Sequence, residues 1–200
     1  EIGVTDIVAL RGDPENGAPT FTPTADGFAD SVELIEALAK TGKFTLRVGA
    51  YPEPHPESHD QAQNVEWLKR KFDAGADEAI TQFFFETETF LRFRDACAAA
   101  GITKTITPGI MPVTNWKSAR NFATRCGASV PAALDEAYAA AIRDDRHDLL
   151  STALCTEMCS ELVSEGVENL HFYTLNRPEL TRAVCRALGV TAQTSLSDVA

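Results

Sequence analysis

The sequence repeats one local pattern, in which a helix-like segment is followed by a glycine and then by a run of apolar and β-branched residues. The glycines of this pattern are Gly3, Gly42, Gly75, Gly101 and Gly166. Each stands where the C-terminal cap of a helix needs a residue that tolerates positive φ. The apolar run after each glycine is therefore predicted to be a strand. These runs are GVTDIVAL, GKFTLRVGA, GADEAITQFFF, GITKTITPGI and GVENLHFYTL.

Between the glycines, apolar residues recur at helical spacing. The clearest examples are FADSVELIEALAK, AQNVEWLKRKFDA, ETFLRFRDACAAA and PELTRAVCRAL. Alternation of helices and strands is typical of α/β proteins with a parallel sheet. The longest interval, from Gly101 to Gly166, has room for extra helices, and Pro131 fits the first turn of one of them.

The fold class that we expect is α/β, a (β/α)8 TIM barrel present as a partial barrel of about five C-terminal β-α units. Residues 1–190 are predicted to form the partial-barrel catalytic domain, and residues 191–200 a short C-terminal tail. The opening residues, Glu1-Ile2-Gly3, resemble the end of a helix. We therefore expect about three further β-α units upstream of Glu1.

Charge narrows the possible partners. The formal net charge is −11, from 18 Lys and Arg residues against 29 Asp and Glu residues. Such a field repels nucleic acid phosphates and acidic membrane surfaces, so neither is an expected partner. No apolar run reaches the roughly 20 residues of a membrane helix, and the start of the sequence lacks a signal-like pattern. The protein is expected to be cytoplasmic.

The cysteines and histidines do not predict a metal site. Five cysteines are an odd number for a disulfide framework, so reduced thiols are expected. Cys155 and Cys159 lie one helical turn apart, two turns after His147, but buried cysteines on a helix usually pack. His55 and His59 are separated by Pro56, which indicates a loop. We expect no bound metal.

Polar residues gather where the predicted strands end. In a β-α barrel the active site lies at the carboxyl ends of the strands, so one mouth would receive these residues. They are Arg11-Gly12-Asp13 after the first strand, Tyr51-Pro52-Glu53-Pro54-His55 after the second, Gln82 in the third and Asn176-Arg177 after the last.

Taken singly, these residues have simpler interpretations. Arg11-Gly12-Asp13 is compatible with a turn containing an internal ion pair. A buried amide such as Gln82 needs partners for both of its ends, which favours a ligand or a tight network. No Rossmann or P-loop glycine motif follows any strand, so phosphates would need other donors. Arg70 and Lys71, late on a predicted helix, are candidates for that role, or else part of a solvated helix face.

Several longer motifs occur in order along the chain: ALRGD, AYPEPHPES, LKRKFDAGADEAITQFFF, ITPGIMPV and HFYTLNR. Together they resemble the methylenetetrahydrofolate reductase family, in its compact bacterial form, from Gly3 to about Val190. The resemblance implies an eight-stranded barrel that binds FAD and takes hydride from NADH or NADPH. It further implies reduction of 5,10-methylenetetrahydrofolate to 5-methyltetrahydrofolate, in one-carbon metabolism and methionine synthesis, by a homo-oligomer when full length.

The resemblance also assigns roles to individual positions. It implies that Asp13 is catalytic, lying near both the flavin and the folate pterin. The FAD-binding positions that it implies are Arg11, Gly12, Asp13, Ala29, Tyr51, His55, Asn64, Arg70 and Lys71. The folate-binding positions that it implies are Asp13, Gln82, Phe122 and Arg177.

The sequence departs from the family pattern at three positions, one of which is in the lists above. Asn64 stands where the family often has Asp, Trp67 occupies a position that is polar in some members, and Ser118 replaces a Gln. The catalytic Glu of the family, a general acid, has no counterpart in these 200 residues. Two other functions stay open from the residues themselves: a non-flavin barrel enzyme acting on a pterin or phosphorylated substrate, and an inactive truncated copy.

Overall fold

The structure, a computed structural model, describes residues 3–12, 21–55 and 58–190. It separates into two compact units. The first is Glu1–Gln82 with Glu88–Pro108, and the second is Phe83–Thr87 with Gly109–Ala200. The predicted tail, residues 191–200, lies outside the described residues.

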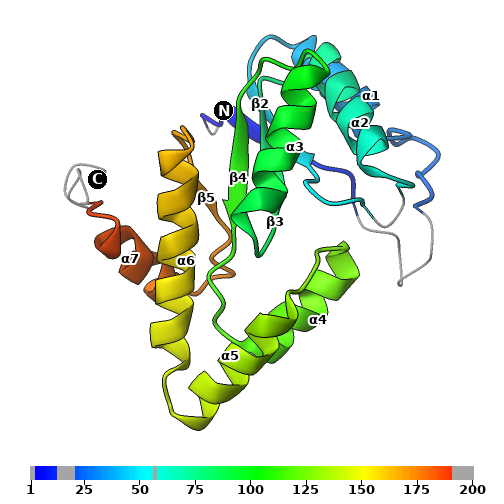
Figure 1. The fold of residues 1–200 in the computed structure, drawn as a ribbon. Coiled ribbons are helices and arrows are strands. Elements are labelled where there is room, and N and C mark those ends of the chain that lie inside the picture. The colour runs from blue at the N-terminus through cyan, green and yellow to red at the C-terminus, as the bar shows by residue number, and fades with distance from the viewer. Residues whose placement is uncertain (1–2, 13–20, 56–57, 191–200) are drawn as a thin grey trace. The chain divides into compact units, whose positions relative to one another are not determined.

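The first unit alternates strands and helices as predicted (Figure 1). Its elements are β1 (Asp6–Ala9), α1 (Ser31–Ala39), β2 (Thr45–Ala50), α2 (Gln61–Asp73), β3 (Glu78–Phe83), α3 (Thr87–Ala99) and the start of β4 (Ile106–Ile110). Side chains cap two of the helices. Asp30 accepts hydrogen bonds from the backbone of Val32 and Glu33 at the start of α1, and Asp60 accepts one from Gln63 at the start of α2.

The strands are hydrogen-bonded in chain order, β1-β2-β3-β4-β5. The pairs β1–β2, β2–β3 and β4–β5 are parallel, with Val8 opposite Arg47 and Arg47 opposite Glu78. Parallel neighbours in sequential order are the arrangement of consecutive β-α units. The predicted fold class, α/β with five β-α units of a partial TIM barrel, is confirmed.

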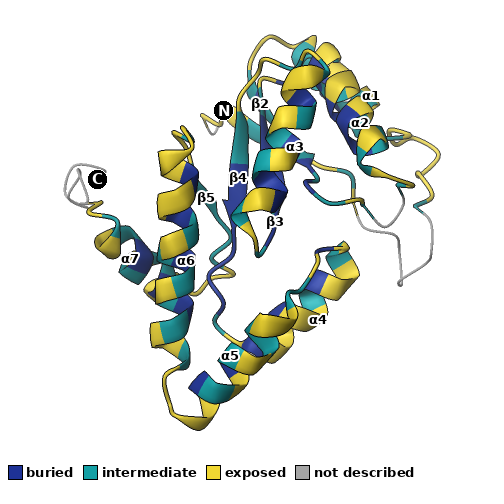
Figure 2. Ribbon diagram, in the orientation of Figure 1, coloured by how far each residue is buried: buried dark blue, intermediate teal, exposed yellow. Residues whose placement is uncertain are grey.

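One face of the first unit's strands packs on its helices. Burial alternates along β2, where Leu46, Val48 and Ala50 are buried. They share a hydrophobic cluster with Ile35 of α1 and with residues of α2 and α3. Figure 2 shows the strands largely dark blue or teal, whereas the helices carry yellow exposed stripes.

The opposite face of the same strands carries charge. Arg47 donates to Asp6 of β1 at 2.6 Å and to Glu78 of β3 at 2.8 Å. Hydrogen bonds from the Thr5 hydroxyl and, second, from Arg47 lower the pKa of Asp6, and the bonds to Glu78 and Asp6 raise the pKa of Arg47. Val8 and Leu10 remain about half exposed, at 49% and 58%. This face therefore holds an ion-paired row next to uncovered apolar side chains.

The second unit contains the predicted extra helices. After β4 come α4 (Trp116–Cys126), α5 (Ala132–Arg143) and α6 (His147–Ser164), then β5 (His171–Phe172) and α7 (Pro178–Ala187). Pro131 is the N-cap of α5, one position before the expected first turn. The last strand is shorter than its apolar run predicts, and beyond its end Leu175 and Asn176 have positive φ, 49° and 59°.

The core of the second unit is aromatic. Tyr138 of α5 stacks on Trp116 of α4, with ring centroids 4.4 Å apart and nearly parallel planes. The hydroxyl of Ser151 donates to the Val113 carbonyl at 2.8 Å and lies 3.2 Å from the Tyr138 hydroxyl. The buried hydroxyl groups are thus satisfied, which a buried polar pair requires.

The glycine junctions give the first testable prediction. Gly75 has φ of 114°, and a Cβ there would lie 2.6 Å from the Cβ of Ala39. Gly75→Ala should therefore lower the free energy of unfolding by about 2–4 kcal/mol, because strain and a steric clash add. Gly42→Ala is the control, since its φ of 63° is also positive but its surroundings are open.

Gly42→Ala should cost only about 1 kcal/mol. Urea unfolding followed by circular dichroism measures both variants. Equal losses at the two positions would show that the close approach of α1 to Gly75 does not matter.

Candidate functional site

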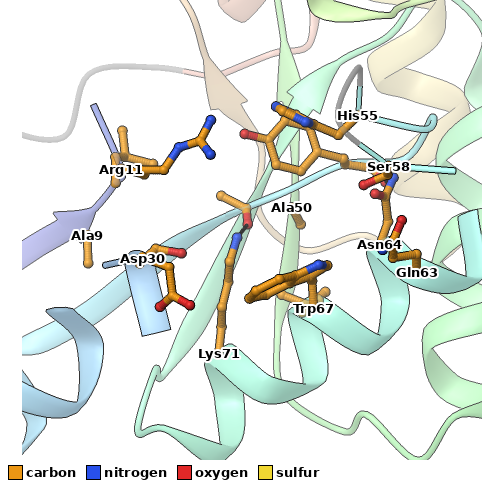
Figure 3. A pocket seen from close by; sticks show the side chains of 15 residues that line it. Ala9, Arg11, Asp30, Ala50, His55, Ser58, Gln63, Asn64, Trp67 and Lys71 are labelled. Carbon is orange, nitrogen blue, oxygen red and sulfur yellow. Dashed lines mark hydrogen bonds between the residues drawn. The ribbon is translucent and has the colours of Figure 1, made fainter. Parts of the chain in front are cut away.

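A cavity of about 330 Å³ opens in the first unit, beside the carboxyl ends of β1 and β2 (Figure 3). Its size is within the usual range for small-molecule sites. The lining residues come from β1, β2, α2, the loop after β2 and the start of α1. They are Ala9, Leu10, Arg11, Asp30, Ser31, Gly49, Ala50, Tyr51, His55, Ser58, Gln63, Asn64, Trp67, Leu68 and Lys71.

Lys71 brings a desolvated cation to this cavity. Its side chain rises from α2 in Figure 3, and its Nζ donates to the Gly49 carbonyl at 2.7 Å. Burial, with a smaller contribution from the Arg11 charge, lowers the pKa of Lys71 to about 8, against the opposing effect of Asp30. The amine is still largely protonated at neutral pH, and any anion bound beside it would stabilise that form.

Arg11 supplies a second cation to the same cavity. It follows β1, and its guanidinium carbon lies 5.0 Å from the centre of the Phe21 ring. Figure 3 shows the Arg11 and Lys71 side chains both extending toward the cavity, which Asp30 also lines. The Asp30 carboxylate is already engaged by the backbone of α1. Two cations against one engaged carboxylate favour an anionic ligand.

Aromatic rings form another part of the wall. Tyr51 and His55 meet edge to face, with ring centroids 4.6 Å apart. Trp67 lines the cavity from α2, one helical turn before Lys71. The wall therefore combines aromatic surface with positive charge, which is the chemistry that recognises a planar ring joined to an anionic group.

Asn64 fixes the loop that carries Tyr51 and His55. Its buried side-chain amide donates to the carbonyls of Tyr51, at 3.2 Å, and Glu53, at 2.8 Å. Gln61 donates to the Pro52 carbonyl at 2.7 Å. Because α2 holds the loop at three carbonyls, the aromatic pair is set in place before any ligand binds.

Not every residue expected on the cofactor side lies at this cavity. Arg11, Tyr51, His55, Asn64 and Lys71 line it. Gly12 lines a neighbouring hollow with Arg11 and Phe21. Ala29 is exposed and its N–H donates to Glu33, just before α1. Arg70 is exposed and is absent from the lining, and Asp13 lies outside the described residues.

The positions expected to bind folate are divided between the units. Gln82 is the half-buried penultimate residue of β3, in the first unit. Phe122 of α4 stacks on Phe83 within the second unit, with centroids 5.3 Å apart. Arg177, also in the second unit, is exposed at the N-cap of α7, immediately after the strained Leu175 and Asn176. That these three residues bind the same folate molecule stays a prediction.

Trp67 and Asp30 are among the lining residues of the cavity that have no role in the prediction from sequence. Trp67 stands out there only as a departure from the family pattern. Asp30 is missed, although the spacing Asp30-x-x-Glu33 before an apolar run is a helix-start signal that places an acid at the N-terminus of α1. Within the described ranges, no group of three His, Cys, Asp or Glu residues is arranged to hold a metal ion. The cysteines, all described, are free thiols.

The fold and the cavity together define the class of protein. It is a parallel α/β protein of consecutive β-α units, with a cavity beside the carboxyl ends of β1 and β2 that is lined by two cations and by aromatic rings. None of the described helices is long and apolar enough to cross a membrane. The family model for methylenetetrahydrofolate reductase matches residues 1–189. The chain belongs to the methylenetetrahydrofolate reductase family.

Curated relatives agree with this assignment. The 5,10-methylenetetrahydrofolate reductase of Pectobacterium carotovorum subsp. carotovorum is 43% identical over 192 residues, which cover 95% of this chain. The enzyme of the same name from Escherichia coli (strain K12) is 42% identical over 191 residues, or 94% of this chain. In both cases the match spans 62% of the relative's own length.

A solved structure shares the fold. It is described as an uncharacterized protein from Clostridium thermocellum that binds two copies of 5-methyl-5,6,7,8-tetrahydrofolic acid. The TM-score is 0.55 at 16% sequence identity, and the match covers 87% of this chain and 64% of that protein. At this identity the likeness supports the fold alone.

The protonation state of the Lys71 amine gives a prediction for ligand binding. Adenosine diphosphate, a probe with a ring and an anionic diphosphate, should bind more weakly as the pH rises through about 8, where Lys71 loses its charge. Between about pH 7 and pH 9 we expect a loss of roughly fivefold to tenfold, measured by isothermal titration calorimetry.

Lys71→Arg is the matched control, because an arginine keeps its charge throughout this range and its binding curve should stay flat. Lys71→Gln should bind weakly at every pH. An unchanged pH slope in Lys71→Arg would assign the titration to another group.

Proposed function

We propose that residues 1–200 are part of an enzyme that reduces 5,10-methylenetetrahydrofolate to 5-methyltetrahydrofolate, with NADH or NADPH as electron donor and FAD as cofactor. Membership of the family and the names of the curated relatives support the reaction. FAD, when bound, supplies hydride transfer between the nicotinamide and the folate. The residues of this chain would bind and orient the cofactor and the substrate.

The observation that carries the proposal is the pairing of Lys71 and Arg11 with an aromatic wall in one cavity. FAD contains a diphosphate between two planar ring systems, so its groups match this combination of charge and ring surface. Lys71 Nζ and the Arg11 guanidinium would neutralise phosphate oxygens with charge-assisted hydrogen bonds. A buried cation that gains an anion also recovers part of the solvation that it lost on folding.

The loop after β2 would hold one ring of the cofactor. Tyr51 and His55 present an aromatic edge and face that Asn64 has already fixed. Gly12, which has no side chain, lets a ligand approach the backbone after β1. We propose Asp13 as the carboxylate beside the reacting rings, where its negative charge would favour hydride release.

On the substrate side we propose Gln82, Phe122 and Arg177. The Gln82 amide offers both a donor and an acceptor, as a pterin edge requires. Phe122 offers a ring for stacking, and Arg177 a cation for a carboxylate of the folate tail. Membership of the methylenetetrahydrofolate reductase family supports a folate as the ligand class. We assign no general acid to residues 1–200.

The complete gene product that contains residues 1–200 provides the direct test. Purified protein should be yellow, release FAD on denaturation, and form 5-methyltetrahydrofolate from 5,10-methylenetetrahydrofolate and NADH or NADPH, as detected by mass spectrometry. A colourless protein that does not bind added FAD, yet acts on a pterin or a phosphorylated compound, would support the non-flavin barrel enzyme instead. A folded protein without either activity would indicate an inactive copy.

Substitution of Gln82 separates the two half-reactions. Gln82→Leu should reduce the folate half-reaction by about tenfold or more, because a polar edge of the substrate loses its partner. Reduction of the bound flavin by NADH or NADPH should change by less than about threefold, as stopped-flow absorbance measures it. Equal damage to both half-reactions would remove Gln82 from the folate site.

A further inference from the structure

Trp67 and Arg70 form a stacked pair at the edge of the cavity. The guanidinium carbon of Arg70 lies 4.0 Å from the centre of the Trp67 ring. Both residues are on α2, three positions apart, which places them on the same side of the helix. Trp67 lines the cavity, whereas Arg70 is exposed and does not. The indole therefore contacts both an exposed cation and the cavity.

This geometry gives Arg70 a partner within α2, the Trp67 ring. A separation of 4.0 Å is short for a cation over a ring and favours a persistent contact. The cation that does reach the cavity from α2 is Lys71. Figure 3 shows the Trp67 indole and the Lys71 side chain next to each other, both rising from α2 toward the cavity. A ring surface and an ammonium group thus stand one helical turn apart on the same wall.

We propose that Trp67 is the stacking platform for the adenine of the bound dinucleotide and that Arg70 is a positioning residue, which acts by holding the indole. The proposal rests on the proposed function, because it takes FAD as the ligand of this cavity. The adenine would lie on the indole while the adjacent diphosphate meets Lys71. Trp67 would then set the preference of the protein for FAD over FMN, which carries the flavin but no adenine.

The first measurement compares FAD and FMN binding. The complete gene product, stripped of bound flavin, is titrated with each compound, and quenching of flavin fluorescence gives the dissociation constants. Trp67→Leu should weaken FAD binding by about tenfold and leave FMN binding within about twofold, as loss of one stacked base predicts. Trp67→Phe, which keeps a ring and guards against misfolding of the leucine variant, should lose no more than about threefold.

A double-mutant cycle tests the role of Arg70. Arg70→Gln should weaken FAD binding by about threefold in the original protein and have no further effect in the Trp67→Leu background, because its action passes through the indole. It should also change the near-ultraviolet circular dichroism of the indole in the unliganded protein. Lys69→Gln removes a neighbouring exposed charge from α2 and should change neither signal.

The outcomes distinguish this inference from the proposed function. If the original protein binds FAD but Trp67→Leu binds it normally, or loses FMN equally, the platform is wrong and the function stands. If Arg70→Gln weakens FAD binding equally in both backgrounds, Arg70 contacts the ligand directly and the positioning role is wrong. Binding of adenosine diphosphate that depends on Trp67, without any flavin binding, would keep the platform and overturn the function. Binding of none of these ligands would overturn both.

Discussion

The buried positive charge of Lys71 is the feature that most restricts which ligand this cavity can bind. It is largely buried, its hydrogen bond goes to the neutral carbonyl of Gly49, and Arg11 adds a second positive charge nearby. Such an arrangement is costly for a folded chain, since desolvation and like-charge repulsion both disfavour the cation. Asp30 offsets part of that cost, but its carboxylate also caps α1. An anionic ligand beside Lys71 would offset part of the remaining cost.

Helix α2 links this site to the core. Leu68 and Phe72 belong to the cluster that packs against β2, while Trp67 and Lys71 line the cavity. Near the start of the helix, Asn64 binds the carbonyls of the loop after β2 and so positions Tyr51 and His55. A single amphipathic helix therefore supplies core packing, loop support and ligand-facing groups. The parallel β-α topology, which brings the start of α2 to the carboxyl end of β2, makes this combination possible.

The sequence predicted most of this architecture but not the orientation of individual side chains. Glycines after apolar helices located the strands, because the positive φ of a helix cap restricts the choice of residue. Strand ends identified Arg11, Tyr51 and His55, since parallel strands place their carboxyl ends together. Adjacent helix positions differ by about 100° in direction. Which of Arg70 and Lys71 faces the cavity therefore depends on how α2 packs on the sheet, and the sequence does not give that orientation. The position of Trp67 in the cavity wall and its contact with Arg70 could not be predicted either, because both depend on how the side chains pack in the folded protein.

If the cavity holds FAD, its diphosphate should lie against Lys71. A crystal structure of the complete gene product with FAD would decide this point. We expect a phosphate oxygen within hydrogen-bond distance of Lys71 Nζ, with the Arg11 guanidinium on the same diphosphate. A flavin bound elsewhere on the protein, with no phosphate beside Lys71 Nζ, would contradict the proposed role of this cavity.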